Sequence, residues 1–284
     1  MKIAVVKYDT RENDENVNLA NKIDENYCKL HGYDYIFDLY KPNEMNYDWE
    51  EFINDEKDLF FSKICYRKLE LIEKYINSDY DYVVMIDSDA CINNPFIRIQ
   101  DLIDNEHDFF ISQDCQMAAW CGHLIPIGET IREYGEKKGT YYSPIPYETI
   151  KNDIIVYGRS VYDHLNYIVT NPNGINTGFI IIKSSDIMKD FIKNCKKYFI
   201  LFQDAFHDQG CIGFLLNHRK YKNTFKILSI DLQGNPFITD AYLFKYDEDK
   251  TFICHFYGHS SEKEKVKGFL NQVQHNKWWS KLYI

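Results

Sequence analysis

Short apolar runs alternate with amphipathic stretches through the first half of the chain. Residues 16–30 carry apolar side chains at helical spacing, and residues 60–76 repeat this pattern. Residues 82–86 are apolar throughout, which is typical of a strand buried on both faces. This alternation predicts an α/β fold, with a mixed, mostly parallel sheet and helices on both faces. The predicted strands are 3–7, 33–39, 82–86, 108–112, 179–183 and 252–256, and the predicted helices are 16–30, 60–76, 185–198 and 262–274.

The periodicity weakens between Asp114 and Asn171, where Gly, Pro and Tyr cluster in residues 135–146. We expect a long, partly irregular insertion there, beside one edge of the sheet, whose tyrosines either face a ligand or pack on one another. A chain of 284 residues is long enough for one large α/β domain. We therefore predict a single domain over residues 1–284, divided into a Rossmann-like half at 1–115, the insertion at 116–172 and a second half at 173–284.

Charge and composition exclude several classes of partner. The chain has 43 acidic and 33 basic residues and a formal charge of -10, which disfavours binding to nucleic acids and anionic membranes. We expect no membrane span and a cytoplasmic location, because no apolar stretch approaches roughly 20 residues and residues 1–6 are too short for a signal peptide. Eight scattered cysteines, with Cys115 and Cys121 as the only close pair, predict reduced and mostly buried thiols. An exposed aromatic insertion would allow a homodimer contact.

Asp87-Ser88-Asp89 directly follows the apolar run at 82–86. In open α/β sheets, the ligand crevice lies just beyond the carboxyl ends of the strands. Two carboxylates separated by one residue can hold Mn²⁺ or Mg²⁺ there, and such an ion neutralises charge on a departing phosphate. A solvated turn is the alternative interpretation. The apolar run before the pair and the turn Asn93-Asn94-Pro95 after it favour a binding site.

A series of further motifs accompanies this acidic pair in a fixed order over residues 20–260. These motifs are Asn21-Lys22-Ile23, Tyr27-Cys28, His31-Gly32-Tyr33, Ser62-Lys63-Ile64, Arg67-Lys68, Asp87-Ser88-Asp89-Ala90, Asn176-Thr177-Gly178-Phe179, Asp208-Gln209 and His255-Phe256-Tyr257-Gly258. Together they resemble the retaining glycosyltransferases of family 34, which include plant xyloglucan xylosyltransferases and fungal α-galactosyl- and α-mannosyltransferases. The ordered set is more specific than any one motif.

This resemblance implies a GT-A fold, a nucleotide-sugar donor, a divalent metal ion and retention of the anomeric configuration. The donor would be a UDP-sugar in preference to a GDP-sugar, and the acceptor a glycan or another hydroxyl compound. Residues 1–115 would bind the nucleotide-sugar, and residues 173–284 would carry acceptor and catalytic groups. Mn²⁺ suits a mixed nitrogen and oxygen site better than Mg²⁺ does.

The resemblance also implies roles for individual residues. Asp87, Asp89 and His255 would surround the metal ion, and Lys63 would pair with the phosphate or nucleotide part of the donor. Asp208 and Gln209 would lie near the anomeric carbon. The remaining donor contacts would come from Ser88, Asn176, Thr177, Gly178 and Gly258.

Each of these positions also has a structural interpretation. His255 could be a histidine satisfied at a strand end, Lys63 a solvated lysine, Asn176-Thr177-Gly178 a plain turn and Asp208 a helix N-cap. The chain departs from the family at His259, where the family commonly has Cys, and in its long insertion. Two other functions remain open: a haloacid dehalogenase-like phosphatase with Asp87 as nucleophile, and a noncatalytic carbohydrate-binding module.

Overall fold

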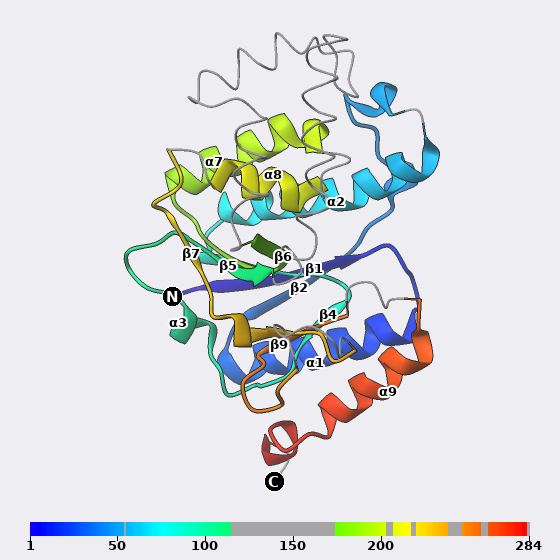
Figure 1. The fold of residues 1–284 in the computed structure, drawn as a ribbon, viewed down its shortest axis with the longest axis vertical. Coiled ribbons are helices and arrows are strands. Elements are labelled where there is room, and N and C mark those ends of the chain that lie inside the picture. Colours follow the sequence, from blue (N-terminus) through cyan, green and yellow to red (C-terminus); the bar gives the residue numbers. More distant parts are fainter. Residues whose placement is uncertain are drawn as a thin grey trace.

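The computed structural model describes residues 1–53, 55–114, 174–202, 207–216, 220–237, 246–256 and 261–282. The predicted insertion at 116–172 lies outside these residues. A six-stranded sheet forms the centre of the molecule, and its helices lie on both faces (Figure 1). The larger sheet contains β2 (Asp34–Leu39), β1 (Ile3–Asp9), β3 (Tyr82–Ile86), β6 (Gly174–Lys183), β5 (Phe109–Asp114) and β7 (Phe225–Ile227), and a smaller sheet contains β4 (Ala90–Ile92), β9 (Ile253–His255) and β8 (Gln233–Gly234). The helices are α1 (Glu15–His31), α2 (Glu56–Ile76), α3 (Ile99–Leu102), α7 (Asp186–Tyr198), α8 (His207–Leu216) and α9 (Lys263–Gln274), with short 3-10 turns at Pro42–Glu44, Glu50–Phe52, Phe199–Phe202, Ile230–Leu232 and Trp279–Leu282.

The six-stranded sheet is mixed and mostly parallel, as predicted. β1 pairs in parallel with β2 and β3, and β5 pairs in parallel with β7. β6 runs antiparallel to both of its neighbours, β3 and β5. The carboxyl ends of β1 and β3 and the amino end of β6 therefore meet at one edge of the sheet. This edge is where side chains from distant parts of the sequence can converge.

Local sequence explains where the two long helices begin and end. The Asp14 side chain accepts hydrogen bonds from two backbone amides at the start of α1, and Asp55 does the same for α2. α1 ends at Gly32, whose φ of 69° lies in the left-handed region that glycine adopts at low cost. The predicted helices and strands are confirmed, although β6 begins at Gly174 rather than at residue 179 and α2 begins at Glu56 rather than at residue 60. The short elements β4, β7, β8 and α3 were not predicted, because two to four residues have no readable period.

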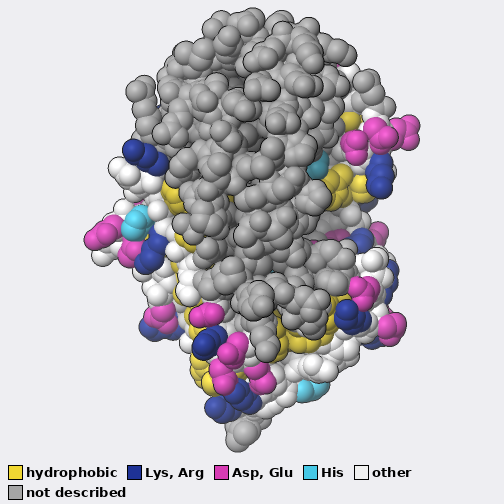
Figure 2. All heavy atoms as spheres, viewed as in Figure 1, with side chains coloured by type: hydrophobic (Ala, Val, Ile, Leu, Met, Phe, Trp, Pro, Cys, Tyr) yellow, Lys and Arg dark blue, Asp and Glu magenta, His cyan; other side chains and the backbone are white. Residues whose placement is uncertain are grey.

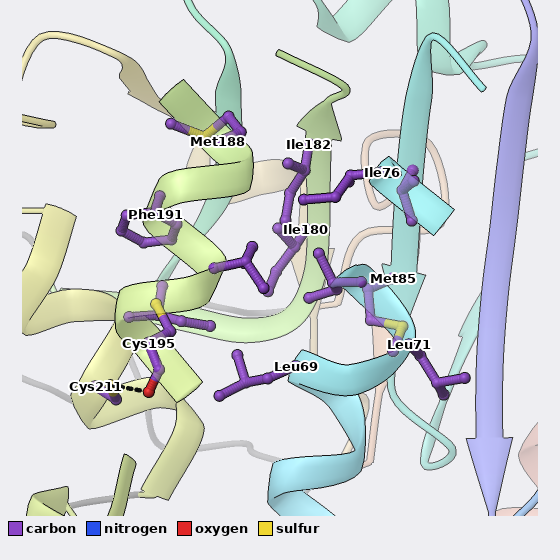
Figure 3. Packing of buried hydrophobic residues seen from close by; sticks show 14 of the residues in the cluster. Leu69, Leu71, Ile76, Met85, Ile180, Ile182, Met188, Phe191, Cys195 and Cys211 are labelled. Carbon is purple, nitrogen blue, oxygen red and sulfur yellow. Dashed lines mark hydrogen bonds between the residues drawn. The ribbon is translucent and has the colours of Figure 1, made fainter. Parts of the chain in front are cut away.

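Apolar side chains fill both faces of the sheet. α2, α7 and α8 cover one face, and α1, α9 and the smaller sheet lie on the other (Figure 1). On the first face, Met85 of β3 and Ile180 of β6 pack against Leu69 of α2 and Phe191 of α7 (Figure 3). Neighbouring strand residues such as Val84 point to the opposite core. Because both faces of β3 and β6 are buried, their register is strongly specified.

A buried ion pair joins α1 to the first residue of β4. The Lys7 Nζ lies 2.8 Å from the Asp24 Oδ2 and donates to the Ala90 carbonyl at 2.6 Å. The other oxygen of Asp24 accepts the Ile92 N–H at 2.9 Å. Both charged side chains are fully buried. The pair therefore fixes the strand that directly follows Asp89.

The described surface and cysteines agree with the composition. Basic and acidic side chains are interspersed over the described part of the face in Figure 2, without a broad patch of one sign there. All described cysteines are free thiols, and each of them except Cys65 is buried. Cys115 and Cys121 lie outside the described residues. Among the helices that the structure describes, none is both long enough and apolar enough to span a membrane.

Replacing Asp24 with alanine should destabilise the fold strongly. The Asp24→Ala change leaves the Lys7 ammonium buried without a counter-ion, which costs about 3–5 kcal/mol. Urea denaturation would measure the loss. Asp79→Ala is the matched control, since Asp79 pairs with Lys2 at the surface and its removal should leave the midpoint unchanged. Equal midpoints for the two variants would contradict a role for the buried pair.

Candidate active site

The end of β3 presents two carboxylates at the sheet edge. The Asp87 N–H donates to the Gly178 carbonyl at 3.0 Å, which anchors the end of β3 to β6. A turn follows, in which the Ala90 N–H donates to the Asp87 carbonyl at 3.1 Å. The Asp87 and Asp89 side chains are 24% and 27% exposed. They are therefore accessible to a ligand but shielded from bulk water.

His255 reaches the same point from the other end of the chain. β9 pairs antiparallel with β4 so that His255 lies opposite Ala90. The His255 Nε2 lies 3.2 Å from the Asp89 Oδ1 and 3.9 Å from the Asp87 Oδ2. Asp87, Asp89 and His255 each offer one ligand atom, and these atoms all lie within 4.8 Å of one another. The structure thus brings together the three residues that the sequence suggests as metal ligands.

The three side chains shift one another's protonation. Burial raises the pKa of Asp87, against the opposing charge of Lys68. Burial acts in the same direction on Asp89, but His255 outweighs it and holds the pKa of Asp89 below its usual range. Burial alone would lower the pKa of His255, but Asp89 and Asp87 raise it above the usual value. Asp89 is therefore the more acidic carboxylate of the pair.

Lys68 of α2 supplies a buried positive charge behind the acidic pair. Its Nζ lies 2.8 Å from the Asp87 Oδ1 and 2.7 Å from the Asp208 Oδ2. It also donates to the carbonyl and the hydroxyl of Thr177, both at 3.2 Å. Burial lowers the pKa of Lys68, but Asp208 and Asp87 raise it by more, so the net shift is upward. The ammonium therefore stays charged although only 4% of the side chain is exposed.

Asp208 and Gln209 enter the site from the first turn of α8. The Asp208 Oδ2 accepts the Thr177 hydroxyl at 2.9 Å, and the Gln209 Oε1 accepts the Thr177 N–H at 3.2 Å. These bonds join α8 to β6. Asp208 is only 5% exposed, whereas Gln209 is partly exposed. Asp208 thus contacts Lys68, and Gln209 is the more accessible of the two.

The charge of this group suits a divalent cation. Asp87, Asp89 and Asp208 contribute three negative charges, and Lys68 contributes one positive charge. With a neutral His255, two negative charges remain. Two carboxylates and an imidazole form a donor set that Mn²⁺ accepts readily. The residues present therefore fit the divalent ion implied by the resemblance to family 34.

Gly178 is required by the position of the His255 ring. A methyl group added at Gly178 would lie 2.2 Å from the His255 Cε1 and 2.9 Å from the Asn176 Oδ1. That oxygen already accepts the Gly178 N–H at 2.8 Å. The Asn176-Thr177-Gly178 segment is therefore part of the β6 strand and contacts the acidic group directly. It is not a plain turn.

A small pocket opens beside Asp89, and Ser88 lines it with Arg11 of the loop after β1. The apolar part of its lining includes Val17 of α1 and Phe256, the residue after β9. The Arg11 guanidinium donates two hydrogen bonds to the Asp9 carboxylate, at 3.0 and 2.7 Å, and the Arg11 backbone N–H donates a third at 2.7 Å. The pocket thus lies at the carboxyl ends of β1 and β3, where open α/β sheets bind ligands.

Two of the residues suggested to bind the sugar donor are not found beside Asp87, Asp89 and His255 in the described structure. The Lys63 Nζ lies 2.6 Å from the Glu50 Oε1 and donates to the Met45 carbonyl at 2.6 Å, so it holds the segment between β2 and α2. Lys68, five residues further along α2, faces the acidic group. Gly258 lies outside the described residues.

Lys68 was not singled out as a site residue from sequence, although a signal exists. Ile64, Lys68 and Ile72 share one stripe of α2 at a spacing of four residues. Ile72 is fully buried and Ile64 packs against the same core. A lysine within the apolar stripe of an amphipathic helix requires a buried partner, so this pattern could have indicated a charged site.

Comparisons with known proteins address the fold. No protein-family model matches the chain, and no curated protein matches its sequence. Among solved structures, the chain is similar to a glycosyltransferase involved in the glycosylation of the major capsid of PBCV-1, with a TM-score of 0.55, 12% identity and coverage of 96% of this chain and 100% of that one. It is also similar to the galactosyltransferase LgtC in complex with donor and acceptor sugar analogs, with a TM-score of 0.50, 14% identity and 96% coverage of both chains.

A third similar structure is that of the bifunctional glycosyltransferase WbbM. Its TM-score is 0.50 at 14% identity, and the match covers 99% of this chain but 51% of WbbM. At these identities the similarity concerns the fold. The chain has the α/β fold of GT-A glycosyltransferases, with a mixed, mostly parallel sheet, as predicted.

Adding a methyl group at Gly178 should displace the His255 ring. We expect Gly178→Ala to cost about 1–3 kcal/mol of stability through overpacking and to weaken Mn²⁺ binding about tenfold or more. Urea denaturation and a Mn²⁺ titration would measure both effects. The control is Gly268→Ala in α9, where the added methyl group would meet nothing within 4 Å apart from its own helix, and a gain of about 0.5–1 kcal/mol is expected. Unchanged Mn²⁺ binding in Gly178→Ala would contradict the position assigned to His255.

Proposed function

We propose that the protein is a retaining, metal-dependent glycosyltransferase, which moves a sugar from a nucleotide-sugar to a hydroxyl group of a glycan or another acceptor. We propose a UDP-sugar as the donor in preference to a GDP-sugar. The observation that carries the proposal is the convergence of Asp87, Asp89 and His255 within 4.8 Å of one another at the end of β3 in a GT-A fold. The doubly negative charge of this group with Lys68 and Asp208 complements a divalent ion.

The chemistry of sugar transfer explains the need for such a group. Breaking the bond between a sugar and a diphosphate leaves negative charge on the departing phosphate oxygens. A Mn²⁺ or Mg²⁺ ion held by Asp87, Asp89 and His255 would neutralise this charge as a Lewis acid. Lys68 keeps Asp87 oriented by a direct ion pair and partly offsets the effect of burial on its pKa. The ion-binding carboxylates are thus set in place before a donor arrives.

Ser88 lines the small pocket beside Asp89, which places its side chain next to the acidic pair. We assign Ser88 and the neighbouring pocket wall to the nucleotide part of the donor, since Ser88 and Asp89 both line the pocket. Asn176 and Gly178 of β6 lie next to the group, and we propose that backbone and amide groups there contact the transferred sugar. The pocket and β6 would thus flank the diphosphate from two sides.

We assign different tasks to Asp208 and Gln209. Asp208 is buried, and its Oδ2 is bonded to both Lys68 and Thr177, so we propose that it positions Lys68. Gln209 is more accessible, and we propose that it contacts the transferred sugar near the anomeric carbon. Retention of the anomeric configuration rests on the resemblance of these two residues to the Asp-Gln pair of family 34.

The two alternative functions make different demands on the same residues. A phosphatase would need Asp87 as a nucleophile, but the Asp87 Oδ1 is paired with Lys68, and the fold matches glycosyltransferases. A noncatalytic carbohydrate-binding module would not need an ion-binding group at the strand end. The complete set of Asp87, Asp89 and His255 supports turnover rather than binding alone.

A donor screen tests the proposal. UDP- and GDP-linked hexoses and pentoses are incubated with the wild type and Asp89→Ala, each with Mn²⁺, Mg²⁺ or EDTA. We expect hydrolysis of one donor that requires Mn²⁺ and falls about 100-fold or more in Asp89→Ala, because this variant lacks an ion ligand. Asp79→Ala, a change at the surface, is the control and should retain full activity. If no donor binds under any metal condition, the proposed function is wrong. Hydrolysis of a simple phosphate ester would favour the phosphatase.

Two lysine variants separate the roles of neighbouring α2 residues. Lys68→Met should lower donor turnover about 100-fold or more, because Asp87 and Asp208 lose their shared counter-ion. Lys63→Met should leave turnover within a few-fold of the wild type and lower stability instead, because Lys63 holds Glu50 and the Met45 carbonyl. Steady-state kinetics and urea denaturation measure the two effects. Loss of donor binding in Lys63→Met at unchanged stability would instead place Lys63 on the donor.

A further inference from the structure

The two nitrogens of the His255 ring face different partners. Its Nε2 faces Asp89, at 3.2 Å. Its Nδ1 lies 3.0 Å from the Nε2 of Gln233, a residue of β8 that is 2% exposed. Gln233 has no part in the function proposed above, and it lies on the far side of the ring from the acidic pair. Its contacts determine which ring nitrogen carries the proton.

A chain of three hydrogen bonds fixes the orientation of the Gln233 amide. The Gly178 N–H donates to the Asn176 Oδ1 at 2.8 Å, and because a backbone N–H can only donate, the atom it meets must be the oxygen of the Asn176 amide. The same oxygen lies 2.9 Å from the Gln233 Nε2, which must therefore be the nitrogen of the Gln233 amide. One hydrogen of that NH₂ group is directed to Asn176, and the other is directed to His255.

The ring nitrogen that receives this hydrogen cannot carry one itself. The His255 Nδ1 therefore accepts from Gln233, and the proton of the neutral ring is on Nε2, where it is donated to Asp89. A cation bound through Nε2 needs the lone pair of that nitrogen. The ring proton must then lie on Nδ1, where metal-bound histidines donate it to an acceptor. The Gln233 NH₂ group cannot accept it.

With an ion bound to Nε2, the proton on the His255 Nδ1 needs an acceptor, and the Gln233 side chain carries one in its Oε1. The Gln233 Oε1 is buried and has no hydrogen-bond partner among the described residues. We propose that Gln233 is the positioning residue for His255 and that its amide has two settings. In the ion-free protein, its NH₂ group faces Nδ1 and keeps the proton on Nε2; with the ion bound, the amide is turned and Oε1 accepts the proton of Nδ1.

The ion-bound setting has a defined cost. Turning the amide replaces the bond from the Gln233 NH₂ group to the Asn176 Oδ1 by a contact between two oxygens. The Asn176 oxygen cannot turn away without losing the Gly178 N–H. Ion binding must therefore offset the loss of the hydrogen bond between Gln233 and Asn176 and the contact between the two oxygens. It must also offset the burial of the Gln233 NH₂ group at the place where Oε1 has no partner among the described residues. The ion-bound orientation of the Gln233 amide rests on the proposed function, because that function supplies the ion. The orientation in the ion-free protein rests on the described hydrogen bonds alone.

Nitrogen NMR of the histidine side chains tests both settings in the wild-type protein. Two-bond correlations between ring protons and ¹⁵N distinguish the two neutral tautomers, and the signals of His255 are those missing from a His255→Asn sample. We expect a protonated Nε2 in the ion-free protein and a protonated Nδ1 after addition of Cd²⁺, a diamagnetic ion. A protonated Nδ1 in the ion-free protein would overturn the assignment.

The response to Cd²⁺ separates failure of the inference from failure of the proposed function. If Cd²⁺ shifts the His255 signals while Nε2 stays protonated, the two settings of Gln233 are overturned and the ion site stands. If Cd²⁺ leaves the His255 signals unchanged, the ion-bound setting and the metal dependence of the proposed function are both overturned.

Variants of Gln233 give an independent measure. Gln233→Met removes the donor and the acceptor at similar volume and should weaken Mn²⁺ binding about 10- to 100-fold, as measured by EPR of the free ion. Gln233→Glu supplies an acceptor and should bind Mn²⁺ at least as tightly as the wild type. Gln272→Met on the exposed side of α9 is the matched control and should leave Mn²⁺ affinity unchanged. Wild-type Mn²⁺ affinity in folded Gln233→Met would overturn the positioning role.

Discussion

The register between β3 and β6 is the constraint from which the candidate site follows. Ile86 lies opposite Phe179, so Asp87, the next residue, meets Gly178 and donates to its carbonyl at 3.0 Å. Slippage by one residue would turn every β6 side chain to the other face of the sheet. The apolar side chains on both faces of the two strands oppose such slippage, because a shifted pair would repack both cores at once. The packing of the sheet thus sets which β6 groups reach the acidic pair.

Lys68 makes a partly buried acidic cluster compatible with a stable fold. An uncompensated buried charge costs about 3–5 kcal/mol, and Asp87 and Asp208 both lie against this one ammonium. The apolar stripe of α2 packs on the sheet and thereby carries Lys68 to the end of β3. The packing of α2 against the sheet therefore also places the positive charge that Asp87 and Asp208 require.

The sequence predicts the parts of this protein that depend on local pattern. The helices, the strand at 82–86 and the α/β class follow from periodicity within windows of about 5 to 20 residues. The structure also brings Asp87, Asp89 and His255 together, and their grouping was inferred from a family resemblance rather than from spacing. Lys68 and Gln233 were missed, because the contact from Lys68 to Asp208 spans 140 residues and that from Gln233 to Asn176 spans 57. No local period records which elements will meet at such separations.

Each carboxylate of the acidic pair is held by a contact within the chain, although the group as a whole keeps two negative charges when His255 is neutral. The Lys68 ammonium pairs with Asp87, and the His255 ring donates to Asp89, so each carboxylate of the acidic pair already has a partner from the chain. These contacts hold the acidic pair in place within the chain, whereas in small zinc domains the metal itself supplies the folding energy. A divalent ion entering this group would have to displace the His255 proton from Asp89 while Lys68 stays in place. Ion affinity would then depend on how readily the His255 Nε2 gives up its contact with Asp89. The contact between Gln233 and the His255 Nδ1, on the other side of the ring, sets this.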